Sequence, residues 1–133
     1  MRTKSTALSP HGKKVLALLA KSDKPMTAYD ILDKLRKFGI KAPPTVYRAL
    51  EQLVERGLAH RIESINAFVA CHEHEQVHQA KFAVCRDCGT ATEIHDPQLT
   101  TLIKALGRKL HFHIEREMIE LLGLCKNCDK AHI

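Results

Sequence analysis

The sequence has no long hydrophobic run and no leader segment of the secretory type. No apolar stretch in its 133 residues approaches the ~18 residues of a membrane-spanning helix. The first segment, MRTKSTALSPHGKK, lacks the continuous apolar region that a signal peptide carries before its cleavage site. Internal repeats and low-complexity segments are also missing. These absences predict a small cytoplasmic protein without a membrane partner.

The five cysteines are therefore not expected to form a disulfide framework. Disulfides are typical of secreted proteins, whereas cysteines of a cytosolic chain more often bind metal or carry redox chemistry. Hydrophobic residues make up 44% of the chain, which is enough for a packed core. The length fits one ordinary domain or two very small ones.

Charge and metal-ligating side chains are separated along the chain. Residues 1–70 hold 13 Lys and Arg against 6 Asp and Glu, whereas residues 71–133 hold 8 against 9. All five cysteines and seven of the nine histidines lie in the second half. This asymmetry predicts a domain over 1–70 that binds a polyanion and a domain over 71–133 that binds metal.

The first half has the pattern of three helices followed by a hairpin. The helix start signals are Ser9-Pro10, Thr27 with Asp30, and Pro43-Pro44. Gly39 and Gly57 are placed to end the second and third helices. Two strand-like runs follow at 58–63 and 67–70. Three compact helices and a two-stranded wing predict a winged helix-turn-helix.

The second half predicts a mixture of short strands and one helix. Short strands are expected at 81–84 and 90–95, a helix at 97–110 and a longer strand at 111–124. The apolar alternation of this last strand slips near Glu117-Met118, where a bulge or bend is expected. The fold class is therefore α+β, a winged helix-turn-helix followed by a small α/β domain.

The strongest chemical motif is a pair of Cys-x-x-Cys knuckles, Cys85 with Cys88 and Cys125 with Cys128. Two intervening residues let both sulfurs of a knuckle reach one ion at about 2.3 Å, and two knuckles complete a tetrahedral Cys₄ site. This donor set favours a closed, structural zinc ion. Paired redox motifs are the alternative, but neither knuckle lies in a βαβ pattern.

A second set of candidate ligands remains after those four cysteines are assigned. It consists of His60, Cys71, His72, His74, His78, Glu93, His95, His111, His113 and His132. Zinc accepts sulfur, nitrogen and oxygen ligands together, so the clustering favours a second site. His111 and His113 are expected on one face of a strand, and we expect this face to be exposed to solvent and not to bind metal.

The chain resembles the ferric uptake regulator superfamily, and within it the zinc uptake regulator branch. The resemblance covers about 9–128 and is carried by the segments PPTVYRAL, HRIESINAFVACH and GLCKNC. It implies a dimeric, metal-dependent transcriptional repressor with an N-terminal winged helix and a C-terminal dimerisation domain. The knuckles match the superfamily's structural zinc site.

The resemblance also implies a regulatory zinc site and hence about two Zn²⁺ per chain. Its ligands are His60, Cys71, His78 and Glu93, with His72 or His74 as alternatives to His78 because the loop is one residue shorter than in some relatives. Iron-sensing relatives place a histidine where this chain has Phe82. Because four such ligands come from both domains, zinc is expected to clamp the domains in the arrangement that binds DNA.

The helix that starts at Pro43-Pro44 is expected to enter the major groove with its N-terminal residues. The residues expected to contact operator DNA are Lys41, Thr45, Tyr47 and Arg48. Arg48 suits a bidentate contact with guanine, and Tyr47 a thymine methyl or a phosphate. Lys41 is expected to contact the phosphate backbone.

The sequence thus predicts a zinc-responsive dimeric repressor of zinc-uptake genes, without a small-molecule substrate. The nearest alternative is a sensor of iron, manganese, nickel or peroxide from the same superfamily. A zinc hydrolase is a more distant alternative, because residues 74–78 read HEQVH, an H-E-x-x-H match by letters. That motif needs a helix, and CHEHEQVH has no apolar helical face, so no enzymatic activity is expected.

Overall fold

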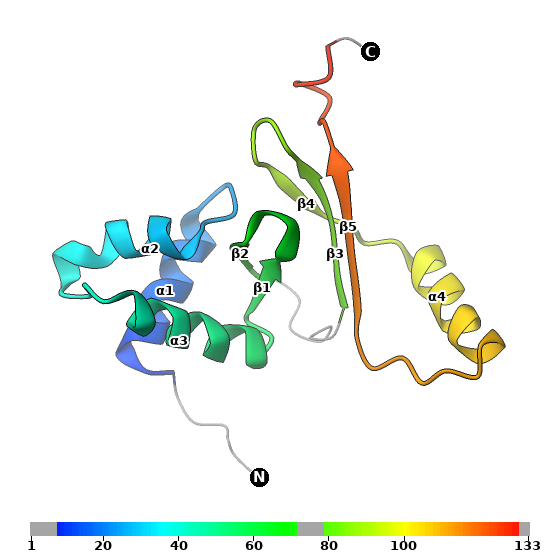
Figure 1. Cartoon of the computed structure of the whole chain (residues 1–133), viewed down its shortest axis with the longest axis horizontal. Helices are drawn as coiled ribbons and strands as arrows, with labels where there is room; N and C mark the ends of the chain where they lie inside the picture. Colours follow the sequence, from blue (N-terminus) through cyan, green and yellow to red (C-terminus); the bar gives the residue numbers. More distant parts are fainter. Residues whose placement is uncertain (1–7, 72–78, 131–133) are drawn as a thin grey trace. The chain divides into compact units, whose positions relative to one another are not determined.

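The computed structural model describes residues 8–71 and 79–130. The chain divides into two compact units, 1–75 and 76–133, called here the first and second unit. The elements of the first unit (Figure 1) are α1 (Pro10–Lys21), α2 (Ala28–Leu35), the 3₁₀ turn η1 (Arg36–Phe38), α3 (Pro43–Glu55), β1 (Ala59–Ile62), the 3₁₀ turn η2 (Glu63–Ile65) and β2 (Ala67–Ala70).

The predicted starts of α1 and α2 are confirmed by side-chain caps. The Ser9 side chain accepts a hydrogen bond from the Gly12 backbone N–H at 3.0 Å. Thr27 and Asp30 form a reciprocal capping box at the start of α2, with both hydrogen bonds at 3.1 Å. Gly39 follows η1 with φ at +92°, a conformation that L side chains rarely adopt. The conformation of Gly39 lets the chain turn sharply between η1 and α3.

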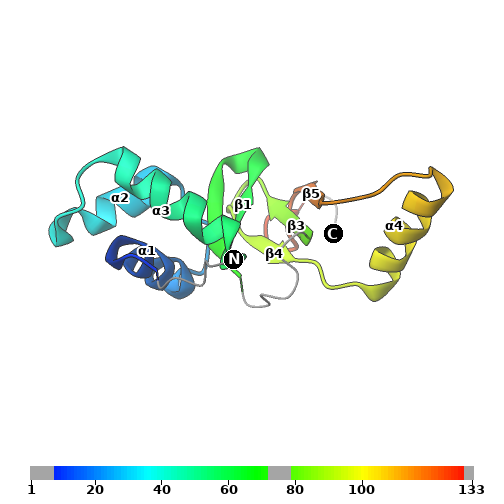
Figure 2. The ribbon, with the colours of Figure 1, turned by 90° about the horizontal axis from the view of Figure 1, so that it is seen from below.

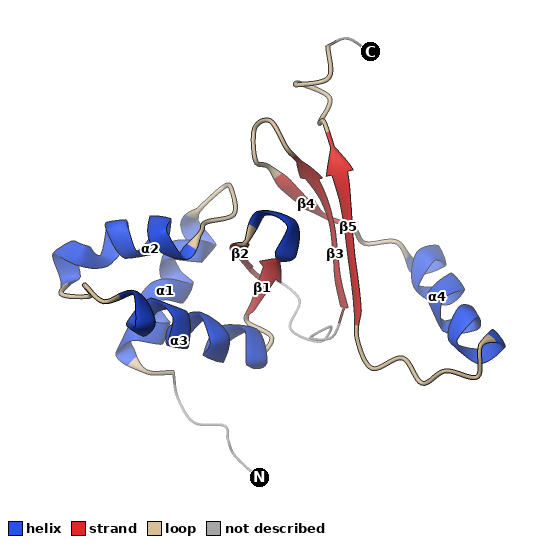
Figure 3. Ribbon diagram, in the orientation of Figure 1, coloured by secondary structure: helices blue, strands red, loops and turns tan. Residues whose placement is uncertain are grey.

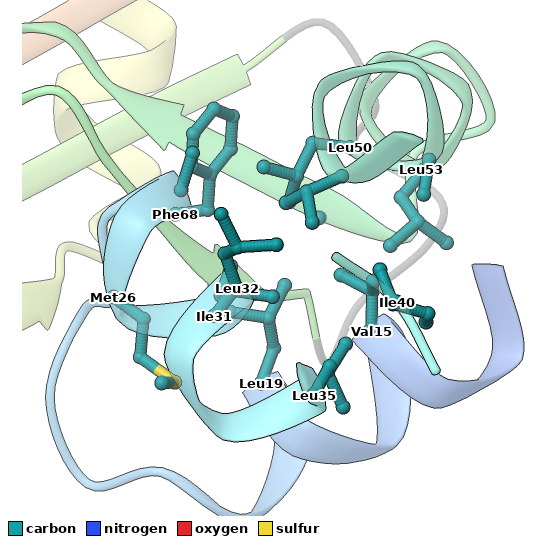
Figure 4. Packing of buried hydrophobic residues seen from close by; sticks show 14 residues of the cluster. Val15, Leu19, Met26, Ile31, Leu32, Leu35, Ile40, Leu50, Leu53 and Phe68 are labelled. Atoms are coloured by element: carbon teal, nitrogen blue, oxygen red, sulfur yellow. The ribbon is translucent and has the colours of Figure 1, made fainter. Parts of the chain in front are cut away.

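The core of the first unit lies between its three helices and the wing. Figure 4 shows the buried side chains that meet there, among them Val15, Leu19, Ile31, Leu32, Leu50 and Leu53. Strands β1 and β2 pair antiparallel. Met26 and Phe68 exchange backbone hydrogen bonds of 3.0 and 2.8 Å, which ties the wing to the segment before α2. The winged helix-turn-helix is confirmed.

The second unit contains β3 (Gln79–Cys85), β4 (Ala91–Glu93), α4 (Pro97–Lys109) and β5 (Glu117–Gly123). Its three strands form one sheet in the order β4-β3-β5, in which β4 runs antiparallel and β5 parallel to the central β3 (Figure 3). With helices and short sheets in the two units, the predicted α+β class is confirmed.

The predicted strand at 111–124 is wrong in its first half. Residues 111 and 112 form the turn that ends α4. His111 adopts φ +53°. The backbone N–H groups of His111 and Phe112 donate to the carbonyls of Arg108 and Gly107, respectively. This pattern is a Schellman-type helix end. Pairing with β3 then begins at Glu117, so the slip in alternation marks the start of the strand and not a bulge.

Helix α4 lies away from the sheet of its own unit in both views (Figure 1 and Figure 2). Large apolar side chains of α4, of the segment that follows it and of β5 are exposed: Leu102, Leu106, Leu110, Phe112, Met118, Leu121 and Leu122. Exposed apolar surface of this extent is typical of a protein interface. No described helix is long and apolar enough to cross a membrane.

A buried ion pair connects the strands β3 and β5. The Lys81 ammonium is 3.5 Å from a Glu117 carboxylate oxygen, and the side chains are 5% and 13% exposed. The same ammonium lies 3.5 Å from the Thr100 hydroxyl on α4. Removing one partner of such a pair would leave a buried charge uncompensated, which is strongly destabilising.

Candidate metal centre

The topology of the second unit brings the two cysteine knuckles together. Strands β3 and β5 are parallel neighbours, and the register pairs Cys85 with Gly123 at their carboxyl ends. The first knuckle begins at the last residue of β3 and the second begins two residues after the end of β5, so both knuckles lie at the same edge of the sheet. The backbone N–H of Arg86 donates to the carbonyl of Gly123 at 2.9 Å, which ties the first knuckle to the end of β5.

The four thiols have the geometry of a tetrahedral metal site. The sulfur atoms of Cys85, Cys88, Cys125 and Cys128 all lie within 4.8 Å of one another. The sulfurs of Cys88 and Cys125 are 3.8 Å apart. Four thiolates at 2.3 Å around one tetrahedral zinc ion would be separated by about 3.8 Å. The donor set and this spacing fit zinc.

Backbone turns shape both knuckles. The Gly89 N–H donates to the Cys85 carbonyl at 2.9 Å, and Gly89 has φ +78°. In the second knuckle, the N–H groups of Cys128 and Asp129 both donate to the Cys125 carbonyl, at 3.0 and 2.9 Å. A side chain at position 89 would be strained by the positive φ, so glycine is the fitting residue after the first knuckle.

Hydrogen bonds prepare part of the cluster for ionisation. Backbone N–H groups of Cys88 and Cys125 lower the pKa of Cys85 to about 6. The hydroxyl and then the N–H of Thr90 lower the pKa of Cys88. The Cys128 thiol behaves oppositely: the sulfur of Cys125, then that of Cys85, raises its pKa to about 12. The sulfurs are thus close enough to oppose one another's ionisation, and a divalent metal bound by all four would favour their thiolate forms.

His60 and Cys71 lie on one face of the wing. His60 pairs with Val69 across the hairpin, and Cys71 follows β2, its backbone N–H donating to the Leu58 carbonyl at 2.9 Å. Because Cys71 is two residues after Val69, the two side chains are diagonal neighbours on the same face. Both are buried, with 5% and 6% exposed. An imidazole and a thiol side by side can bind a borderline-soft metal.

Of the other predicted regulatory ligands, the structure describes Glu93 alone. Glu93 ends β4, where it pairs with Phe82, and its side chain is 24% exposed. His78 and its alternatives, His72 and His74, lie outside the described residues, as does the HEQVH segment. The ligand set of the second metal therefore stays a prediction.

The predicted DNA contacts lie at the start of α3. Tyr47 and Arg48 are exposed in its first turns, Thr45 is half-buried and Lys41 is exposed in the connector before the helix. The opposite face of α3 packs into the core through Val46, Leu50 and Leu53. The N-terminal turns of this helix are thus available to a ligand.

Thr90 is a residue of the centre that the sequence analysis missed. Its hydroxyl oxygen lies 3.1 Å from the Cys88 sulfur. The sequence feature that could have indicated Thr90 is a hydroxyl side chain two residues after a knuckle cysteine.

Elsewhere, within 8–71 and 79–130, no further group of three or more potential ligands is close enough to hold a metal. His111 and His113 lie before β5 and not on a strand face, which corrects that expectation.

Known proteins resemble the chain over both units. Residues 3–122 match the Ferric uptake regulator family. A Zinc uptake regulation protein of Escherichia coli (strain K12) is 37% identical over 127 residues, covering 94% of this chain and 74% of the relative. A zinc uptake regulator complexed with zinc and DNA is 36% identical, with a TM-score of 0.83 over 93% of this chain and 84% of the other. Holo XcZur is 38% identical, with a TM-score of 0.81 over 93% and 87%.

Replacing Cys125 by Ser tests the Cys₄ centre. The change leaves three thiolates around an ion that prefers four, and the binding energy of a structural metal is folding energy. We expect the variant to lose one zinc ion per chain and to unfold at a lower temperature. Metal analysis after dialysis and thermal unfolding followed by circular dichroism measure both effects.

Asn127→Ser is the matched control, because it changes an exposed residue inside the same knuckle and keeps all four sulfurs. It should retain the metal and the unfolding temperature. A Cys125→Ser protein with the zinc content and stability of the control would exclude this centre.

Proposed function

Since the chain belongs to the ferric uptake regulator family, over residues 3–122, we propose that it is a zinc-responsive transcriptional repressor. It binds operator DNA as a homodimer when zinc occupies a regulatory site, and it controls genes of zinc uptake. The observation that carries the proposal is the recognition helix: α3 presents Tyr47 and Arg48 at its exposed N-terminal turns. A helix-turn-helix reads the major groove with this part of its second helix.

The charge of the first half supports DNA as the partner. An excess of seven positive charges over residues 1–70 attracts phosphate groups and releases their counterions. Arg48 offers a guanidinium for a bidentate contact with guanine. Lys41, just before α3, suits a phosphate contact that sets the register without reading the sequence.

The exposed apolar surface of the second unit supports a homodimer. Leu102 and Leu106 of α4 and Leu110, its C-cap, recur at a spacing of four residues and are 66%, 50% and 62% exposed. Residues four apart lie on one helix face, so these three form an apolar stripe. Burying such a stripe against a second copy would contribute about 25 cal/mol for each Å² of apolar surface removed from water.

Two zinc ions per chain are proposed, with different roles. The Cys₄ centre holds the structural ion. The regulatory ion binds His60, Cys71, His78 and Glu93, which combine soft and hard donors that zinc accepts together. Cys71 favours zinc over iron(II) or manganese, since a thiolate is a soft ligand. A relative in a solved structure, a zinc uptake regulator complexed with zinc and DNA, supports zinc as the metal.

Regulation requires that zinc distinguishes two arrangements of the protein. A ligand shifts a conformational equilibrium only by its difference in affinity for the two states. Moving the DNA-binding arrangement from about 1% to 99% takes a preference of roughly 10⁴, or about 5.5 kcal/mol. Zinc held by four protein ligands can supply this energy, because such sites contribute about 10–16 kcal/mol.

Replacing Arg48 by Ala tests the recognition helix. The variant should lose about 1–3 kcal/mol of affinity for a preferred duplex and relax the preference at one base position. The duplex is one that the zinc-loaded wild-type protein selects from a random library. Fluorescence anisotropy with this duplex and its single-base variants measures both changes.

Lys41→Ala is the comparison for Arg48→Ala. A phosphate contact should weaken all duplexes alike and reduce the slope of log affinity against log salt by about one. If Arg48→Ala behaves in this way and keeps its specificity ratio, Arg48 contacts phosphate and does not read bases.

Replacing Cys71 by Ser tests the regulatory site. The change removes the soft ligand and leaves both knuckles intact, so the protein should stay folded and dimeric with its structural zinc. Without that ligand, zinc no longer prefers the DNA-binding arrangement. We expect the increase in operator affinity on adding zinc to be lost, and His60→Ala should behave similarly.

Val69→Ala is the matched control, since it shortens a partly buried neighbour on the same face of the wing and removes no ligand. It should keep the response to zinc. A Cys71→Ser protein whose DNA binding still tightens with zinc by the wild-type factor would show that the regulatory site lies elsewhere.

A further inference from the structure

An exposed phenylalanine in the turn before α3 has two lysine ammonium groups over its ring. The Nζ atoms of Lys14 on α1 and Lys37 on η1 lie 5.2 and 5.4 Å from the centroid of the Phe38 ring. Phe38 is 55% exposed, so its ring is not a core side chain. A cation within about 6 Å of an aromatic centroid is attracted to the negative face of the ring. The ring therefore holds two positive charges from separate elements near one another.

Neither ammonium group is neutralised by a carboxylate. Within 8–71 and 79–130, no ion pair joins Lys14 or Lys37 to an acidic side chain. The two aspartates of α2 are engaged elsewhere, because Asp30 caps its own helix and Asp33 lies 3.8 Å from the Nε atom of Arg36. Two like charges held close together repel each other. A bound anion would relieve this repulsion.

The two lysines lie next to the predicted DNA-reading helix. Lys37 and Phe38 belong to η1, which continues α2 into the turn before α3 (Figure 1). In a helix-turn-helix the first helix crosses the DNA backbone while the second enters the major groove. Lys41, the predicted phosphate contact, is exposed four residues after Lys37. The anion that fits this position is therefore a phosphate group of the DNA backbone.

We propose that Lys14 and Lys37 contact phosphate groups of the DNA backbone, and that the Phe38 ring positions their ammonium groups for this contact. The inference rests on the proposed function and adds to it two phosphate contacts and one positioning residue. An ammonium is a compact charge with three donors, which suits phosphate oxygens and carries no base preference. Because the ring already restricts both lysine side chains, less conformational freedom is lost when DNA binds.

Removing both lysines tests the phosphate contacts. In Lys14→Ala/Lys37→Ala, the slope of log affinity against log salt should fall by about one for each lysine removed from a bound protomer. The affinity advantage of the zinc-loaded wild type over this variant should therefore shrink at least about tenfold between about 50 and 200 mM salt. Fluorescence anisotropy measures binding to a selected duplex and to an unrelated one, and both should weaken alike.

Lys21→Ala is the matched control for the lost charge. It removes an exposed lysine in the last turn of the same helix, α1, and leaves both ammonium groups on the Phe38 ring. This variant should keep the wild-type salt slope.

Phe38→Leu separates the ring from the charges. The variant keeps both lysines and an apolar side chain, but it lacks the aromatic face that attracts the ammonium groups. DNA affinity should fall about two- to fivefold for each bound protomer, since this is the strength of a cation–π contact at an exposed site, while the salt slope stays that of the wild type. Phe38→Tyr restores an aromatic ring and should restore the affinity.

The outcomes separate the inference from the proposed function. If the zinc-loaded wild type binds DNA and the double lysine variant keeps its salt slope, the two lysines are solvated charges and the inference is wrong. Wild-type affinity in Phe38→Leu would overturn the positioning role of the ring. If the zinc-loaded wild type binds no DNA, the proposed function is refuted and the inference with it. A reduced slope, together with rescue by Phe38→Tyr, establishes the inference.

Discussion

The sheet of the second unit gathers four cysteine sulfurs within 4.8 Å of one another, and their mutual repulsion as thiolates favours a bound cation. The parallel pairing of β3 with β5 brings knuckles from distant parts of the sequence to one edge of the sheet. Hydrogen bonds lower the pKa of Cys85 to about 6, while neighbouring sulfurs raise that of Cys128 to about 12. A divalent metal resolves this conflict, and strand pairing and metal binding thereby support each other.

The division of charge along the chain has a functional meaning in the proposed repressor. The basic half carries a recognition helix whose inner face is packed and whose first turns are exposed. The ligand-rich half carries the metal chemistry. The wing departs from this division, because it carries the imidazole of His60 in the basic half and is followed directly by the thiol of Cys71, both of them buried. We propose that this exception lets a metal signal reach the DNA-binding unit.

The features that could be predicted from the sequence are those determined by residues close together in the chain. The cap of α1, the capping box of α2 and the core positions of α3 follow from side chains a few residues apart, and the knuckle spacing follows from zinc geometry. The start of β5 was missed, because a helix end at His111 competed with strand periodicity. The approach of Lys14 to the Phe38 ring was also missed, since it joins elements that are far apart in the chain.

The central claim is that zinc controls DNA binding, and a metal titration tests it most directly. A preferred duplex is first selected from a random library with the protein loaded with each ion in turn. Binding of the protein to these duplexes is then measured under reducing conditions while the buffered free concentration of zinc, iron(II), manganese or nickel is raised. The account predicts that zinc tightens DNA binding at a free concentration far below that of any other ion, because Cys71 supplies a soft ligand. Tight binding without metal, or an equal response to iron(II) or manganese, would contradict it.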